Sequence, residues 1–300
     1  MKMYSRGLER MSEHRFGVLL LSPAFLLILV LVAYPIVYSL YLSFSDLVLS
    51  RSPVPRFVGL RNYAEMLRNP IFLASLWKTG FFSVSFLLAT TIFGMLVALL
   101  LNNNFWGKNL VITSLLIPWA IPKVVNGLIW KWIYDGNYGI LNAILVKLGI
   151  IGEYRFFFGG SPLSAILLIS IANAWKLMPF VALMILAALQ TIPKTLYEAA
   201  KVDGAGALQR FFKITVPQLK YSLIIIFILQ TTAAVKVFDI IAVLTQGGPG
   251  DTTMVTYYYV YRVAFDYLNI GLASAGAYLV TAVIVVFAIV YYKTLGGGTE

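Results

Sequence analysis

Two clusters of polar residues interrupt long apolar stretches of this 300-residue chain. The first cluster holds Asn173, Trp175 and Lys176, and the second holds Gln230, Lys236 and Asp239. A charge at membrane depth costs at least about 2.5 kcal/mol on insertion scales, so such residues usually face a cavity or a partner. Amide, charged and aromatic groups together suit the hydroxyls and C–H faces of a sugar ring. We therefore expect both clusters to line a solute path.

Some of these polar residues also have plausible structural roles. Lys236 and Asp239 are three positions apart and could neutralise each other along one helix. Thr231 and Thr232 are expected to hydrogen-bond to their own helix rather than to a solute. These alternatives stay open on the sequence alone.

Composition identifies the chain as an integral membrane protein. Hydrophobic residues make up 60% of it and charged residues 12%, which leaves too little polar surface to cover a soluble globule. The net charge of +11 comes from basic residues scattered between apolar runs, a pattern that does not favour nucleic acid as a partner. The chain has no cysteine and one histidine, so we expect no disulfide, no metal site, no catalytic centre and no cofactor.

Six apolar runs are long enough to cross about 30 Å of hydrocarbon. They cover residues 17–44, 76–101, 109–133, 162–190, 220–246 and 270–292. Prolines inside several runs require neighbouring helices to satisfy the freed carbonyls, which favours a packed bundle. No segment between the runs is long enough to build a core of its own. The sequence therefore predicts an all-α integral membrane protein with six transmembrane helices, in which residues 1–300 form a single transmembrane domain.

The placement of lysine and arginine predicts the orientation of the runs. Both termini and the loop 191–219 lie on the side that carries more basic residues. The positive-inside rule then places these segments in the cytoplasm and residues 45–75 outside.

The third run carries further polar and aromatic residues. Trp130, Trp132 and Tyr134 are expected to form an aromatic belt at its outer end. Lys123 and Asn126 are candidate wall residues of the solute path, with Lys123 paired or extended to the interface.

The polar passage at 191–219 has the signals of a folded knob. Thr195 and Glu198 have the spacing of a capping box, so a short helix is expected to begin after Pro193. Asp203 and Gly204 are expected to end that helix. An ordinary solvated loop with a helix cap would have the same composition.

A second short helix is expected from about Ala207 to Lys213, ending before Pro217. Ala199 and Ala200 leave one face of the first helix smooth, where another surface could approach closely.

The spacing of this passage resembles the EAA loop of permease subunits in binding-protein-dependent ABC importers. The pattern is Glu198-Ala199-Ala200, three residues, Gly204, nine residues, Ile214, one residue, then Val216-Pro217. Three more segments resemble the sugar-importing, maltose/trehalose-type branch: residues 57–63, 138–142 and 244–249. The chain departs from the pattern at Val216, where leucine is usual, and at Tyr221, where a proline often stands.

The resemblance implies a type I ABC importer permease fold in the cytoplasmic, or inner, membrane. Glu198, Ala199, Ala200, Asp203 and Gly204 would then form the coupling contact with an ATP-hydrolysing subunit. The sequence has no Walker A pattern, so the permease itself would be non-catalytic. The implied partners are a second permease subunit, two ATP-binding subunits and an external sugar-binding protein, with an oligosaccharide or disaccharide as the solute.

Other functions remain as alternatives. The same machinery could carry glycerol-3-phosphate or another polar solute. A stand-alone secondary transporter belongs to a different class, but inverted repeats with acidic coupling residues are not evident. An intramembrane enzyme is less favoured, because no acid–base pair or metal cluster recurs across the runs.

Overall fold

The computed structural model describes residues 13–296. Their packing divides into two compact units. The first unit holds the described residues up to Met66 and Val263–Tyr278, and the second holds Leu67–Arg262 and the described residues from Leu279 onward. The predicted position of the two chain ends concerns residues outside the described range.

The first unit begins with one long apolar helical segment. Helix α2 (Glu13–Ile28) continues through a π-helical turn, η1 (Leu29–Ala33), into α3 (Tyr34–Ser43). The wide turn precedes Pro35, which has no N–H to donate to the carbonyl one turn earlier. From Gly17 to Ser43 the segment is 27 residues long, enough to cross a membrane.

The connection after α3 is fastened by the side chains of α4 (Arg61–Arg68). Strands β1 (Ser45–Asp46) and β2 (Arg56–Phe57) form a short antiparallel pair. Buried Asn62 donates hydrogen bonds to the carbonyls of Ser43 and Ser45 at 3.0 and 2.9 Å. The segment 57–63 that stood out in the sequence therefore stabilises this connection.

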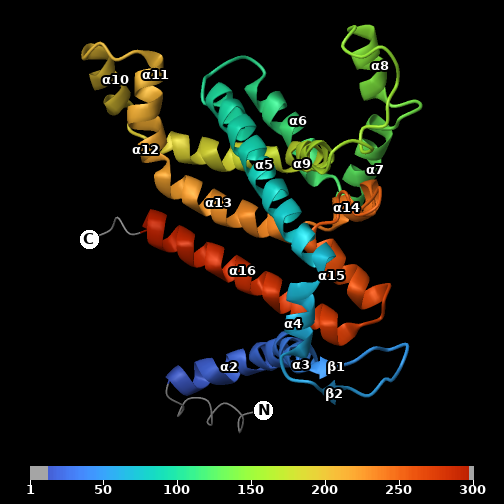
Figure 1. Cartoon of the computed structure of the whole chain (residues 1–300). Helices are drawn as coiled ribbons and strands as arrows, with labels where there is room; N and C mark the ends of the chain where they lie inside the picture. Colours follow the sequence, from blue (N-terminus) through green and yellow to red (C-terminus); the bar gives the residue numbers. More distant parts are fainter. Residues whose placement is uncertain (1–12, 297–300) are drawn as a thin grey trace, which may run out of the picture. The chain divides into compact units, whose positions relative to one another are not determined.

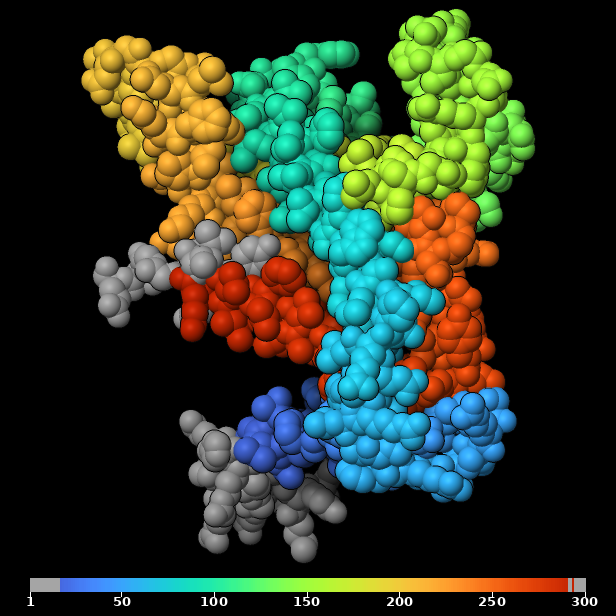
Figure 2. Space-filling model, viewed as in Figure 1, coloured from blue at the N-terminus to red at the C-terminus, as the bar shows by residue number. Residues whose placement is uncertain are grey.

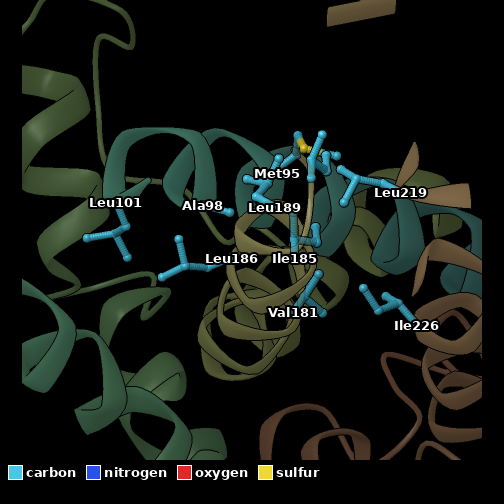
Figure 3. Packing of buried hydrophobic residues seen from close by; sticks show 10 residues of the cluster. Met95, Ala98, Leu101, Val181, Ile185, Leu186, Leu189, Leu219 and Ile226 are labelled. Carbon is cyan, nitrogen blue, oxygen red and sulfur yellow. The ribbon is translucent and has the colours of Figure 1, made fainter. Parts of the chain in front are cut away.

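The second unit is built around two long crossing helices, α5 (Pro70–Leu101) and α9 (Pro162–Gln190) (Figure 1). Helix α13 (Lys220–Val235) packs against both. Their buried side chains form a continuous hydrophobic cluster (Figure 3). Its members include Met95, Ala98, Leu101, Val181, Ile185, Leu186, Leu189, Leu219 and Ile226.

The third apolar run is not the single helix that the sequence predicts. It forms α6 (Lys108–Ala120) and α7 (Lys123–Ile133), which meet at a bend of 95°. Pro122 occupies the N-cap of α7 and the residue before it, Ile121, is extended, because a proline disfavours helical backbone at the preceding position.

The fifth run is also interrupted. Helix α13 ends at Val235, and α14 (Asp239–Leu244) begins after a break of three residues. The remaining helices of the described chain are α8 (Ile140–Lys147), α15 (Thr256–Phe265) and α16 (Ile270–Gly296), apart from the short helices α10 to α12 described below. Within residues 13–296, five helical segments are long and apolar enough to cross a membrane, or six if α6 and α7 count as one.

The expected aromatic belt is only partly present. Trp132 is exposed, as a belt residue should be, but Tyr134 is buried and donates a hydrogen bond to the Leu168 carbonyl at 3.0 Å. Trp130 packs at 5.0 Å from the Tyr134 ring. The structure therefore gives Tyr134 a role in packing, because its hydroxyl finds a backbone acceptor inside the protein.

Candidate functional site

The knob comprises residues 194–218, which stand at the end of α9 and the start of α13 (Figures 1 and 2). Its first helix, α10 (Lys194–Val202), begins directly after Pro193, as the sequence predicts. The predicted capping box is wrong. Pro193 takes the N-cap position, so Thr195 falls inside the helix, and the described residues provide no side-chain cap there.

The end of α10 has the predicted form. Gly204 follows the C-cap residue Asp203 with φ +79°, a left-handed conformation that favours glycine. Its N–H donates to the Lys201 carbonyl at 3.1 Å, and the Ala205 N–H donates to the Ala200 carbonyl at 2.8 Å. These two bonds make a Schellman motif, which turns the chain sharply after the helix.

The second half of the knob does not stop at Pro217. Helix α11 (Ala207–Arg210) passes through a π-helical turn, η2 (Phe211–Thr215), into α12 (Val216–Gln218), and α13 follows after one residue. Pro217 follows the wide π-helical turn, which lets the chain stay helical although this proline has no N–H to donate to the previous turn. The expected break at this proline is therefore wrong.

Hydrogen bonds tie the two halves of the knob together. The hydroxyls of Tyr197 and Thr215 lie 3.0 Å apart, and the Arg210 guanidinium donates to the Ala205 carbonyl at 2.8 Å. Tyr197 and Phe211 also pack against the hydrophobic cluster of α5, α9 and α13. The knob is therefore packed directly against the long helices.

The free surface of the knob is partly apolar. Glu198 and Ala199 are exposed and Ala200 is half-buried. Near them on the knob, Val202, Leu208 and Phe212 expose 88%, 74% and 64% of their surface. Exposed apolar side chains that gather on one surface are typical of a protein contact.

A second candidate site is a polar cavity of about 350 Å³ in the second unit. Its walls come from α7, α9, α13 and α14, and its polar and aromatic lining consists of Lys123, Asn173, Thr232, Lys236, Phe238 and Asp239. The cavity thus brings together Asn173, Lys236 and Asp239 from the two predicted clusters.

Asp239 pairs with a residue from a different helix than the sequence suggests. Its carboxylate lies 3.2 Å from the Lys123 ammonium, and among the described residues it forms its ion pair with this lysine and not with Lys236. Lys123 and Asp239 are the first residues of α7 and α14, while Gly127 and Val243, four residues on, also touch. The two helices therefore run side by side in the same direction.

Gly127 permits this close approach. A Cβ at this position would lie 2.8 Å from the Cβ of Val243, nearer than side chains normally come. The ion pair at the cavity wall thus depends on a glycine one turn further along the helix.

The other predicted residues are not among the described side chains that line the polar cavity. Gln230 is buried in α13. Trp175 packs edge-on against Trp130, with ring centroids 6.0 Å apart. Lys176 is buried and donates to the Trp119 carbonyl at 2.9 Å, which satisfies a backbone group next to the bend between α6 and α7.

One aromatic residue of the cavity wall was not predicted from the sequence. Phe238 supplies an aromatic ring to the cavity and packs 4.7 Å from the ring of Tyr261. Its position directly before Asp239 was the available signal. Asn126, a candidate wall residue, is not among the described residues that line the cavity; it is buried, and its Oδ1 has no partner among the described atoms. Thr232 bonds to the Ile228 carbonyl at 2.8 Å, as predicted.

Comparison with known proteins places the chain in a family. Residues 90–295 match the family described as binding-protein-dependent transport system inner membrane component. The chain belongs to this family. The match includes both the knob and the polar cavity.

Individual relatives cover nearly the whole chain. The sulfoquinovosyl glycerol transport system permease protein of Agrobacterium fabrum is 38% identical over 97% of this chain and 94% of its own. The trehalose/maltose transport system permease protein of Thermococcus litoralis is 39% identical over 94% of each chain. A crystal structure of a bacterial ABC transporter that imports alginate shares the fold, with a TM-score of 0.82, 21% identity and coverage of 99% of both chains.

Proposed function

We propose that this chain is a transmembrane permease subunit of an ATP-driven importer that translocates a sugar delivered by an external binding protein. The observation that carries the proposal is the polar cavity between four membrane helices of a permease-family chain. The two relatives are named for transport systems for trehalose/maltose and for sulfoquinovosyl glycerol. These names support a saccharide as the solute.

The polar cavity suits one or two sugar units. An amide from Asn173, a carboxylate from Asp239 and the ring of Phe238 offer hydrogen bonds and an aromatic face. We assign these residues to the solute path together with Lys236. Trp175, Lys176 and Gln230 support the surrounding helices instead.

An acidic sugar or a small phosphorylated solute is a second candidate. The cavity lining holds two lysines, Lys123 and Lys236, against the single carboxylate of Asp239. Among the described lining residues one ammonium therefore has no carboxylate partner, which favours a solute with a negative group. A Lys236→Gln variant separates the two: uptake of an acidic solute should fall strongly, and uptake of a neutral sugar only slightly.

The knob provides the coupling contact in this proposal. Glu198, Ala199 and Ala200 with the turn at Asp203 and Gly204 would dock on an ATP-binding subunit, with Val202 and Leu208 adding apolar contact area. Two such ATP-binding subunits and a second permease complete the importer. The single permease domain spans residues 1–300 of the inner membrane protein, with the knob and both termini in the cytoplasm.

The test uses the assembled importer with its binding protein in proteoliposomes. An ATPase and a second permease should copurify with this chain, and Asp239→Asn should lower sugar uptake while basal ATP hydrolysis persists. The Lys123–Asp239 pair is partly exposed, so its loss alone should change stability by no more than about 1 kcal/mol.

A double change distinguishes solute contact from structural pairing. If Lys123→Gln combined with Asp239→Asn restores full uptake, Asp239 is structural and the solute path lies elsewhere. If the chain transports a sugar with neither an ATPase nor a binding protein, the importer assignment itself is wrong.

A further inference from the structure

A second cavity of about 600 Å³ lies at the opposite end of α7 and α14 from the polar cavity. Its walls come from residues 131–137, the segment 154–158, and residues 244–249 at the end of α14. We call it the aromatic cavity, because Tyr134, Tyr154, Phe156 and Phe158 line it.

The aromatic wall is held rigidly. Phe158 packs edge-on against both Tyr134 and Phe156, at centroid distances of 5.6 and 6.0 Å. Asn142 is fully buried, donates to the carbonyls of Asp135 and Arg155, and accepts from the Arg155 N–H. The segment 154–158 is thus fixed against the end of α7.

The facing wall is fixed as well. The Thr253 hydroxyl donates to the Gly248 carbonyl at 2.9 Å and lies 2.8 Å from the Thr245 hydroxyl. Buried Lys78 of α5 donates to the carbonyl of Asp251. The cavity therefore has preformed walls on both sides, which lowers the entropic cost of binding a ligand.

The polar groups of the aromatic cavity are suited to hydroxyls. The Asp135 carboxylate accepts hydrogen bonds from the backbone N–H groups of Asn137 and Tyr138, which hold its pKa below the ordinary value. It stays an ionised acceptor at neutral pH. Lys131 and Asn137 add donors. Tyr154 and Phe156 expose 43% and 60% of their surface, so their rings are available to the C–H face of a ligand.

We propose that the aromatic cavity is a second saccharide site, which holds the sugar before it reaches the polar cavity. Helices α7 and α14 both begin at the polar cavity and end at the aromatic one. From Lys123 to Lys131 the separation along α7 is about 12 Å at 1.5 Å per residue. An oligosaccharide can therefore contact both cavities in turn while it slides along the same two parallel helices. This inference rests on the proposed function.

Protection from alkylation tests the site without requiring transport. The chain has no cysteine, so an Asn137→Cys variant places a single thiol of this chain at the cavity. In the assembled importer without ATP, trehalose, maltose and sulfoquinovosyl glycerol serve as probes. At least one should slow alkylation, by about twofold at the concentration that half-fills the site.

Two further variants make the result specific. Tyr138→Cys is the matched control, because its side chain is 69% exposed and is not among the residues that line the cavity, so its alkylation should not change. Phe156→Ala added to Asn137→Cys should abolish the protection. Phe156 is largely exposed, so this change removes the ring without opening a core.

Two results overturn the site. One is unchanged alkylation of Asn137→Cys with all three saccharides. The other is protection by the unloaded binding protein but not by any saccharide, which would make the cavity a protein-docking surface. With either result the parent importer would still take up sugar. If the proposed function itself were wrong, the parent importer would show no sugar uptake.

Discussion

Lys176 illustrates how a polar residue at membrane depth can serve the backbone. It was a candidate for the solute path, but its ammonium donates to the Trp119 carbonyl close to the bend between α6 and α7. Asn62 and Asn142 play the same kind of role in two loops, where each binds two carbonyls. In an apolar surrounding an unpaired carbonyl is costly, so these side chains stabilise irregular backbone.

We predict that Lys176→Met lowers stability and leaves solute recognition unchanged. The Trp119 carbonyl would lose its partner, at a cost of about 1 to 3 kcal/mol. Thermal unfolding of the detergent-solubilised importer should show a lower Tm, while the sugar concentration for half-maximal uptake by the folded fraction stays constant. A large rise in that concentration with an unchanged Tm would contradict this prediction and indicate that Lys176 belongs to the solute path.

At the scale of elements, the knob depends on the turn that ends α10. Gly204 combines a positive φ with a hydrogen bond from its N–H to the Lys201 carbonyl. Hydrophobic contacts and the Tyr197–Thr215 pair then join the turn to α5, α9 and α13. A change in this turn should therefore affect coupling more than membrane insertion.

We predict that Gly204→Pro abolishes stimulation of ATP hydrolysis by the loaded binding protein. Proline fixes φ near −65° and has no N–H, so it can adopt neither the observed conformation nor the hydrogen bond. Gly206→Ala is the matched control, because Gly206 has φ −68° and open space around its Cα. Stimulated ATPase activity in proteoliposomes measures both, and normal stimulation of the Gly204→Pro importer would refute the coupling role.

At the scale of the whole molecule, the proposed orientation rests on the distribution of basic residues. Single cysteines can test it in this cysteine-free chain. We predict that Ser52→Cys reacts with a membrane-impermeant maleimide from the outside, and Gln209→Cys only from the cytoplasmic side. The reverse pattern in oriented membranes would invert the topology and remove the knob from the ATP-binding subunits.

The sequence predicts the long helices better than their interruptions. Run length and hydropathy were enough for α9, whose ends at Pro162 and Gln190 match the expected bounds. The 95° bend in the third run was missed, because hydropathy does not change where Pro122 redirects the chain. The Lys123–Asp239 pair was missed for a related reason: spacing along one helix reveals neighbours on that helix, and this pair joins two helices 116 residues apart.

The buried amide of Asn142 also has a practical consequence for engineering. By joining Asp135 to Arg155 it holds the two ends of the intervening segment together. Gly152, within this segment, has open space around its Cα. Lengthening a closed loop costs only about 0.6 kcal/mol for each doubling. We therefore expect the chain to tolerate a rigid fusion partner at Gly152. Such a partner would serve as a fiducial mark for aligning images of this small membrane protein in electron cryomicroscopy.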